Sequence, residues 1–346
     1  MLDFSKEYWE DIKKASGNIP DISGLYKKSV FITGATGMIC STVADMLWYL
    51  NDKEKAGIRL VLAGRNEERI KKRFPYMKDG DYVFMRFDTS DVSVSDERFD
   101  FIIHGAGNAD PNAIMKEPVE TILTNIIGLH NLFGLLKDND SRMLFISSSE
   151  IYGRKVESGS MSEEDYGFVD ILNPRSSYPN AKRISETLCA AYKEEYGKDS
   201  VIVRPGHVYG PSVTDRDSRA SAEFTRKVVG GEDIVLKSDG RKVRSYIYTA
   251  DCASAIITVL LKGESTNAYN ISNPDTSASI KEFARVMAEA GGVEVVFDVE
   301  TVQDKRSGNM MDNSVIDPGR LCSIGWKPEF DLESGICATL RDYIKE

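Results

Sequence analysis

The chain has few of the residues that build metal sites and disulfide frameworks. Its 346 residues include only three histidines, whose spacing is not that of metal ligands: His104, His130 and His207. The five cysteines are scattered, odd in number and form no CxxC pair: Cys40, Cys189, Cys252, Cys322 and Cys337. We therefore expect no metal site and no disulfides, and we interpret the cysteines as small buried residues of a protein in the reducing cytoplasm.

Long apolar runs and an excess of positive charge are also missing. No stretch of about 18 apolar residues is present, so no membrane-spanning helix is predicted. The first residues, MLDFSKEYWEDIKK, lack the apolar core of a secretory signal. The net charge of −10 disfavours nucleic-acid binding, which needs basic patches. We thus predict a cytoplasmic protein with no membrane or nucleic-acid partner, although backbone N–H groups and a few arginines could still bind one nucleotide.

Short apolar runs alternate with helical patterns from residue 28 onward. The runs span 29–33, 58–64, 82–87, 99–105, 142–147 and 200–205, and helical patterns lie at 38–50, 117–137 and 178–197. Strands that alternate with helices predict parallel βαβ units, and continuous apolar strands fit a sheet covered on both faces. We predict an α/β fold with a Rossmann-type doubly wound parallel sheet, which binds nucleotides at the carboxyl ends of its strands.

The pattern divides the chain into three parts. Residues 1–27, with an amphipathic pattern at 3–15, are predicted to form an N-terminal helical extension, and 28–204 a NAD(P)-binding Rossmann domain. Beyond residue 205, glycine, proline and polar loops become frequent, so 205–346 are expected to form mainly a smaller C-terminal α/β substrate lobe. The chain is expected to cross back to the Rossmann domain at least once, with 244–248 and 267–272 as candidates.

The segment TGATGMIC, residues 33–40, follows the first predicted strand and opens a helix. A phosphate-binding glycine loop requires this context. Gly34 allows the tight turn, and Gly37 lets the backbone approach a pyrophosphate at the positive end of the helix. Cys40 stands where a third glycine is usual and is small enough for close helix–sheet packing. An ordinary strand–helix turn is the alternative, but the strands downstream favour a dinucleotide cofactor.

Tyr178 and Lys182 lie four residues apart in YPNAK and therefore share one face of a helix. A phenol has a pKa near 10 and is a poor base at neutral pH, but a nearby ammonium lowers that pKa. The pair could then exchange a proton with a sugar hydroxyl while hydride moves to or from nicotinamide. Taken alone, the motif is more often a surface pair on an amphipathic helix.

A third motif, SSSEIYG at 147–153, follows the strand predicted at 142–147. A hydroxyl at the carboxyl end of a parallel strand lies where ligands bind, although a polar turn that ends the strand is the alternative. The three motifs in this order are far more specific than any one of them.

Together the motifs resemble the extended short-chain dehydrogenase/reductase family, which includes nucleotide-sugar epimerases, dehydratases and decarboxylases. The resemblance runs from about residue 28 to 343 and also includes HGAG (104–107), TNIIG (124–128), RPGHVYGP (204–211), RSYIYTAD (244–251) and IGWKPEF (324–330). It implies an enzyme that binds a nucleotide-diphosphate sugar and oxidises it at C4. The 4-keto intermediate is then epimerised, dehydrated or decarboxylated.

The resemblance also implies a role for each matching residue. Ser148 would hydrogen-bond the reacting C4 oxygen, Tyr178 would be the acid/base there, and Lys182 would hold the nicotinamide ribose. Arg244 would pair with the substrate diphosphate, although a surface salt bridge is its alternative. The other cofactor contacts implied are Gly34, Thr36, Gly37, Met38, Ile39, Asp88, Thr89, Gly105, Ala106 and Asn125, the last of which would also support the active-site helix.

Two positions depart from the common family pattern. Residues 62–66 read LAGRN, without the acid that usually holds the adenosine ribose, and Arg65 there can accommodate a 2′-phosphate. We therefore favour NADP over NAD. His207 stands where relatives commonly carry an asparagine that contacts the substrate, so it either hydrogen-bonds the substrate or packs locally.

The outcome of the reaction depends on residues near Glu150. The pair Ser149-Glu150 is similar to UDP-glucuronate decarboxylases and GDP-mannose 4,6-dehydratases, and the stretch around YPNAK looks more like the decarboxylases. We predict that Ser149 contacts the substrate and Glu150 joins the catalytic residues, with decarboxylation favoured. Arg65 is instead similar to NADP-using dehydratases and ketoreductases. An NADPH-dependent 4-ketoreductase and a non-catalytic dinucleotide-binding sensor are the alternatives.

The resemblance finally implies a homodimer. Relatives commonly dimerise through the two helices that carry the Tyr–Lys motif and Asn125. The apolar residues Ile184, Leu188 and Tyr192 could serve that interface or the core.

Overall fold

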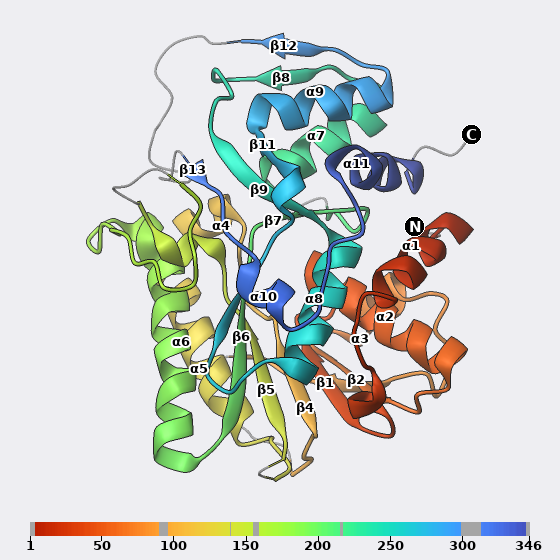
Figure 1. Cartoon of the computed structure of the whole chain (residues 1–346), viewed down its shortest axis with the longest axis vertical. Coiled ribbons are helices and arrows are strands. Elements are labelled where there is room, and N and C mark those ends of the chain that lie inside the picture. The colour runs from red at the N-terminus through yellow and green to blue at the C-terminus, as the bar shows by residue number, and fades with distance from the viewer. Residues whose placement is uncertain are drawn as a thin grey trace.

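The computed structural model describes residues 4–89, 96–138, 140–154, 159–214, 217–298 and 313–343. Its centre is a seven-stranded sheet in the order β3-β2-β1-β4-β5-β6-β10, in which every neighbouring pair is parallel (Figure 1). The strands are β1 (Ser29–Thr33), β2 (Arg59–Gly64), β3 (Val83–Arg86), β4 (Phe101–His104), β5 (Arg142–Ile146), β6 (Asp199–Pro205) and β10 (Ala268–Ile271). The predicted Rossmann-type parallel sheet is therefore confirmed.

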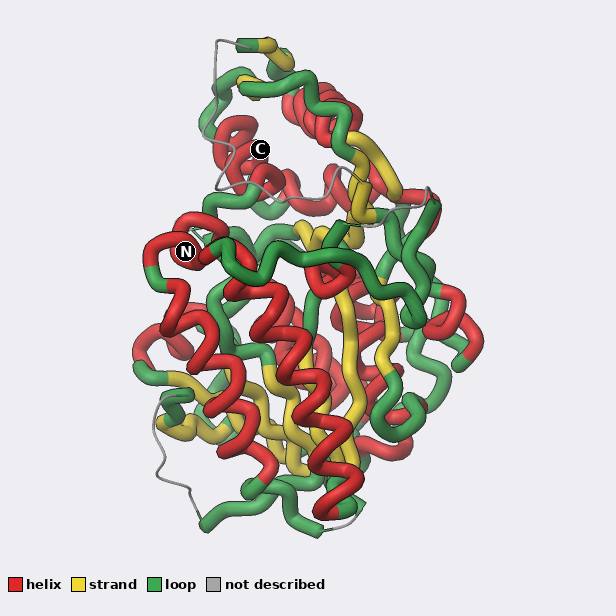
Figure 2. The backbone as a smooth tube through the Cα atoms, turned by 90° about the vertical axis from the view of Figure 1, so that its left-hand side faces the viewer, coloured by secondary structure: helices red, strands yellow, loops and turns green. Residues whose placement is uncertain are grey.

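Both faces of this sheet are covered by helices. Alternate residues of each strand point to opposite faces and therefore join two different cores. Val30 and Ile32 of β1 join the core formed with α2 (Met38–Glu54), α8 (Thr249–Lys262) and α1 (Lys6–Ser16). Phe31, between them, joins a second core under α5 (Pro118–Phe133) and α6 (Ser177–Tyr196). Figure 2 shows helices standing against one face of the strands. Burial on both sides explains why these strands are continuous apolar runs.

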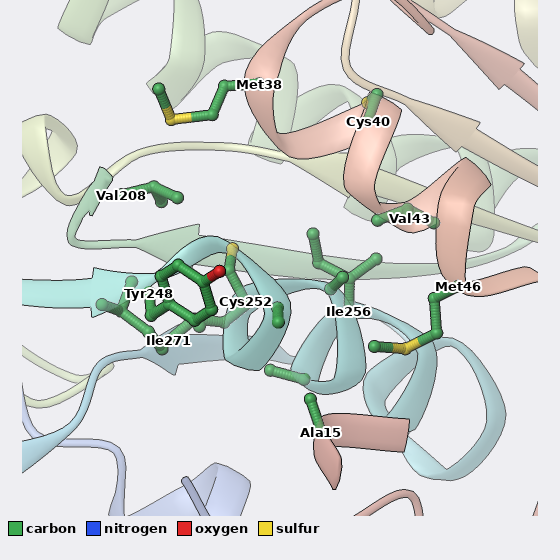
Figure 3. Close-up of a cluster of buried hydrophobic side chains, with 14 of the residues drawn as sticks. Ala15, Met38, Cys40, Val43, Met46, Val208, Tyr248, Cys252, Ile256 and Ile271 are labelled. Atoms are coloured by element: carbon green, nitrogen blue, oxygen red, sulfur yellow. The ribbon is translucent and has the colours of Figure 1, made fainter. Parts of the chain in front are cut away.

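The larger core lies where α2 and α8 pack together. Figure 3 shows Cys40, Val43 and Met46 of α2 beside Cys252 and Ile256 of α8, with Ala15 of α1 below. Three of the five cysteines are buried, but Cys322 and Cys337 are exposed, so the interpretation of all five as buried residues is wrong for those two. They lie on the short α10 (Gly319–Ser323) and on α11 (Leu332–Arg341), where those helices face solvent.

The N-terminal helix α1 links the Rossmann sheet to the C-terminal helix α11. Asp11 accepts a hydrogen bond from Arg341 at 2.6 Å, and Ser5 donates one to Asp342 at 2.6 Å. Tyr8 donates to the buried Asp45 of α2 at 2.5 Å. Figure 1 accordingly shows the two ends of the chain on the same flank.

The smaller lobe lies above the sheet in Figure 1 and has its own strands. Strand β9 (Val243–Tyr248) pairs with β7 (His207–Tyr209), β11 (Ser277–Ser279) and β13 (Asn313–Ser314), and β8 (Ile234–Leu236) pairs with β12 (Val295–Phe297). Helices α7 (Ala220–Val229) and α9 (Ile280–Gly291) pack against these strands, while α3 (Glu67–Arg73) and α4 (Pro111–Lys116) belong to the Rossmann part. The candidate crossing at 244–248 is therefore wrong, because that segment extends the small sheet, whereas 267–272 supplies β10 of the large one.

None of the helices in the described ranges is both long and apolar enough to cross a membrane.

Candidate active site

The carboxyl ends of β1, β4 and β5 meet at one edge of the sheet. Thr33 pairs in register with His104, and His104 with Phe145. Because these strands are parallel and adjacent, the segments that follow them emerge side by side. The glycine loop, the HGAG segment and the serine motif thus meet at one place.

Gly34 lies where the glycine loop comes closest to the HGAG segment. Its φ is +68°, which favours glycine, and a Cβ here would lie 2.8 Å from the carbonyl carbon of Gly105 and 2.9 Å from the amide nitrogen of Ala106. Gly37 is the N-cap of α2, and no described side chain caps this helix end. The first N–H groups of α2, from Met38 and Ile39 onward, therefore lie at an uncapped positive helix terminus suited to an anion.

Cys40 replaces the third glycine without separating helix α2 from the sheet. Its Sγ lies 2.2 Å from where a Cβ of Gly105 would stand. The side chain added at position 40 is therefore accommodated by the missing side chain at position 105.

A pocket of about 560 Å³ opens beside this loop. Its lining includes many of the predicted cofactor residues: Gly34, Thr36, Arg65, Asp88, Thr89 and Ala106. Asn66 and Arg69 also line the pocket, and the sequence analysis missed them. Asn66 is the N-cap of α3 and Arg69 lies in its first turn, positions that form no motif, so the only signal in the sequence was their proximity to Arg65. This end of the pocket therefore carries two arginines, both exposed to solvent.

Asn125 is buried on α5 beside the same loops. Its Nδ2 donates to the carbonyl of Thr121 at 2.8 Å, while its Oδ1 is buried without a hydrogen-bond partner among the described residues. Ser185 of α6 donates to the backbone carbonyl of Asn125 at 3.4 Å. Asn125 thus connects α5 to the helix that carries the Tyr–Lys motif.

Tyr178 and Ser148 come together through their side chains. Tyr178 stands in the first turn of α6, is buried, and lies close enough to the Ser148 side chain for that side chain to lower the pKa of the phenol. Burial and the charge of Glu150 raise the pKa of Tyr178 to about 12, against the opposing effects of Ser148, Arg219 and Arg175. The phenol is therefore neutral at physiological pH in this structure.

Lys182 lies one helical turn beyond Tyr178 but does not lower its pKa as we predicted. Its ammonium donates to the carbonyl of Ile146 at 2.8 Å and lies 4.6 Å from the centre of the Phe145 ring, against 5.8 Å for the Tyr178 ring. The charge is thus directed to the end of β5 rather than to the phenol oxygen, and the prediction of a lowered Tyr178 pKa is wrong here. Burial lowers the pKa of Lys182 itself to about 8.

Glu150 stands in η2 (Ser149–Tyr152), the 3₁₀ turn that Ser148 caps. Its carboxylate accepts a hydrogen bond from the buried Arg175 at 3.0 Å. Both side chains line a second pocket of about 380 Å³, with Arg154, Phe168 and Pro179 among its other residues. Ser149 is buried and lines neither pocket. Arg175 was not among the residues predicted from the sequence, although it lies three residues before Tyr178.

The remaining predicted residues lie in the smaller lobe. Arg244 on β9 is buried and donates to the carbonyl of Val243, and His207 on β7 stands 5.9 Å from the Tyr246 ring, centre to centre. Burial, Arg244 and Arg219 lower the pKa of His207 to about 3, so its ring is neutral, and its Nδ1 is buried without a described partner.

Arg219 was missed by the sequence analysis and lies between the two parts of the site. It is the N-cap of α7, contacts Met38 Sδ at 4.0 Å, and pairs with Asp217. Its charge lowers the pKa of both Tyr178 and His207. An arginine before a helix carries no motif of its own, so only the fold reveals this position.

Comparisons with known proteins agree with this geometry. The model of the NAD dependent epimerase/dehydratase family matches residues 30–272. UDP-glucuronic acid decarboxylase 1 of Xenopus tropicalis is 29% identical over 324 residues, which are 92% of this chain and 73% of that protein. DesIV, a dTDP-glucose 4,6-dehydratase from Streptomyces venezuelae with NAD and TYD bound, has a TM-score of 0.77 at 22% identity and covers 91% of this chain and 96% of its own.

RMD from Pseudomonas aeruginosa, complexed with NADPH, has a TM-score of 0.68 at 22% identity and covers 91% of this chain and 99% of its own. Structural neighbours thus include complexes with either form of the nicotinamide cofactor. The predictions that the protein is an enzyme and that its cofactor is a nicotinamide dinucleotide are confirmed. The preference for NADP over NAD stays a prediction. The family model matches well over half of the chain, and the chain therefore belongs to the NAD dependent epimerase/dehydratase family.

Proposed function

We propose that the enzyme oxidises a nucleotide-diphosphate sugar at C4, with Tyr178 as the proton acceptor. The observation that carries the proposal is the position of the buried Tyr178 near Ser148, which follows β5, close enough for the serine side chain to lower the pKa of the phenol. Two hydroxyls that lie near each other can both hydrogen-bond one substrate oxygen. The site residues named from the sequence are part of this proposal.

The residues around the glycine loop fit a dinucleotide. Gly34 leaves room where a Cβ would strike backbone atoms, the start of α2 is uncapped, and Asn125 Oδ1 is buried and unpartnered among the described residues. The proposed cofactor contacts are Gly34, Thr36, Gly37, Met38, Ile39, Arg65, Asp88, Thr89, Gly105, Ala106, Asn125 and Lys182. The oxidised nicotinamide, when bound, supplies a hydride acceptor and a positive charge that lowers nearby pKa values.

The chain's own residues then handle the proton. Ser148 would hold the C4 oxygen, and Tyr178, ionised once the charge of the bound cofactor has lowered its pKa, would take the C4 hydroxyl proton as hydride passes to the nicotinamide. With its pKa lowered to about 8, Lys182 is still mostly protonated at neutral pH, and its ammonium can donate to a ribose hydroxyl as well as to Ile146. In the smaller lobe, Arg244 and Arg219 would bind the diphosphate, with the neutral His207 as a hydrogen-bonding partner of the substrate.

We propose decarboxylation as the step after oxidation, with UDP-glucuronate as substrate. The similarity to UDP-glucuronic acid decarboxylases along nine-tenths of the chain supports this outcome. Glu150, whose charge raises the pKa of Tyr178, would then act on the atoms next to C4. The 4-keto group would accept the electrons released as carbon dioxide leaves.

A second candidate is an NADPH-dependent 4-ketoreductase. Arg65 and Arg69 at the adenosine end of the 560 Å³ pocket favour it, because two guanidinium groups can bind a 2′-phosphate. The same observation supports NADP over NAD for either reaction.

We further propose a homodimer that works in the cytoplasm. Helices α5 and α6 lie side by side at the flank of the sheet in Figure 1, and both carry exposed apolar side chains: Val119, Ile122, Leu123 and Ile184. Leu188 and Tyr192 instead pack against the core beneath them. Five free cysteines fit a reducing compartment. Light scattering of wild type and Ile184→Glu tests the interface, since a buried charge should yield monomers.

The function is tested by incubating the enzyme with UDP-, dTDP-, GDP- and CDP-sugars, with NAD or NADP, and weighing the products. Loss of carbon dioxide from UDP-glucuronate is expected. Loss of water from another sugar would identify a dehydratase, an isomer of unchanged mass an epimerase, and a gain of two hydrogens with NADPH the ketoreductase. Turnover of none of these sugars would contradict the proposal.

A further inference from the structure

We propose that Arg175 is a positioning residue, which fixes the orientation and the charge of Glu150 beside Tyr178 and so governs the step that follows C4 oxidation. The inference rests on the proposed function, because it assigns Glu150 a place next to the reacting carbon. Glu150 lies in η2, which directly follows Ser148, and Arg175 lies in η3 (Pro174–Ser176), which ends two residues before Tyr178.

The two turns hold both partners firmly. Ser148 caps η2 by accepting a hydrogen bond from the Glu150 amide at 3.2 Å. Asn173 caps η3 by accepting one from the Arg175 amide at 3.0 Å. With both backbones fixed, the 3.0 Å bond from the Arg175 guanidinium to Glu150 Oε1 restricts the remaining freedom of the carboxylate. Arg175 is only 3% exposed and Glu150 only 23%, so water competes weakly for the bond.

A nearby arginine shows what a structural ion pair looks like in this protein. Arg204 on β6 uses Nε and both terminal nitrogens, and contacts Glu186, the Tyr152 hydroxyl and the Glu163 carbonyl. Among the described residues, the side chain of Arg175 has one hydrogen-bond partner, Glu150, and its buried Nε has none. Since a buried guanidinium costs free energy unless its donors are satisfied, stability alone does not account for Arg175.

The charges of Glu150 and Arg175 both act on Tyr178, the predicted proton acceptor. The groups that act on Tyr178 are Glu150, Ser148, Arg219 and Arg175; the carboxylate raises the pKa of the phenol, and the two arginines lower it. Removal of Arg175 would leave Glu150 as an uncompensated charge, free to turn or to take up a proton. Removal of Glu150 should have the opposite effect on Tyr178.

The test compares Arg175→Met, Arg175→Lys, Glu150→Gln and the double variant in turnover of the sugar nucleotide that the wild type accepts. For Arg175→Met we expect kcat to fall by about tenfold and the acid limb of its pH profile to move up by about one unit. Glu150→Gln should move that limb down, and the double variant should return it toward wild type. Arg175→Lys should restore most of the wild-type limb, because the cation is retained.

Arg154→Met is the matched control, because Arg154 lines the same 380 Å³ pocket and is exposed to solvent. Its pH profile should match that of wild type. The inference is overturned if Arg154→Met shifts the limb as much as Arg175→Met, or if Arg175→Met lowers kcat without moving the limb.

A second readout separates this inference from the proposed function. If the wild type accepts none of the sugars, the proposed function fails, but crystal structures of the wild type and Arg175→Met still report on the pair. Displacement of the Glu150 carboxylate in the variant supports the positioning role. An unchanged Glu150 would refute it.

Discussion

The two ends of the large sheet differ in how their polar groups are satisfied. At the amino end, Asp100 before β4 accepts hydrogen bonds from the amide and hydroxyl of Ser29 at 2.9 and 2.7 Å, with Lys28 and Lys137 within 3.5 Å. Burial alone would raise the pKa of Asp100, but Ser29 and the two lysines lower it to about 2. At this end of the sheet, groups of the chain itself stabilise the ionised Asp100 carboxylate.

At the carboxyl end the same strands support groups whose charged forms are disfavoured. Burial raises the pKa of Tyr178 and lowers that of Lys182, and Asn125 Oδ1 is buried without a described partner. Groups that will bind or exchange protons with a ligand cannot all be satisfied within the protein. The contrast indicates that one end of the sheet contributes stability and the other keeps its polar groups available.

The largest expected effect is the loss of turnover in Tyr178→Phe. Removing the hydroxyl removes the proton acceptor, so kcat should fall about a thousandfold while the fold and cofactor affinity remain. Steady-state kinetics and cofactor titration measure the two quantities. The control is Tyr196→Phe, an exposed residue at the other end of α6, which should behave as wild type. Turnover that survives Tyr178→Phe would disprove the mechanism.

A smaller effect is expected for Gly34→Ala, on cofactor affinity. The variant adds backbone strain at a φ of +68° and a collision with Gly105, so affinity should fall about a hundredfold. Gly197→Ala is the control, because it has the same φ of +68° but no atom within 4 Å. That variant should lose about 1 kcal/mol of stability and retain its affinity. Equal cofactor affinities in the two variants, measured by calorimetry, would contradict the role of the close approach.

The next effect concerns cofactor choice. Arg65→Ser removes a cation at the carboxyl end of β2, and we expect the affinity for NADP to fall about tenfold while that for NAD stays constant. Arg59→Ser, which removes an arginine paired with Glu97 at the start of the same strand, should change neither. If Arg65→Ser binds NAD and NADP as the wild type does, Arg65 does not contact a 2′-phosphate.

The smallest effect on activity is expected at the amino end, for Asp100→Asn. Because the folded pKa of about 2 lies below the ordinary 3.8, ionised Asp100 contributes stability above the ordinary value, which is lost as pH falls through about 2. Near neutral pH the variant should lose about 1–2 kcal/mol in urea unfolding, with kcat unchanged. The difference should shrink toward about pH 3. A loss independent of pH would point to packing rather than charge.

Much of the Rossmann part could be predicted because its signals are local. Continuous apolar runs identified the strands, and TGATGMIC identified the turn whose Gly34 meets Gly105. The smaller lobe was harder, since β9 has the apolar character of a sheet strand yet pairs with β7, β11 and β13. Pairing partners are chosen by long-range contacts that a single segment does not encode.

The sequence by itself determined the family, the parallel sheet and the spacing of Tyr178 and Lys182, because motif order and helical periodicity are properties of short segments. The tertiary structure alone decided where the Lys182 charge points, that Arg175 holds Glu150, and that Arg219 lies between the two parts of the site. Each of these depends on residues that are distant in sequence or on burial, and a pKa follows from the surroundings of a group rather than from its neighbours along the chain.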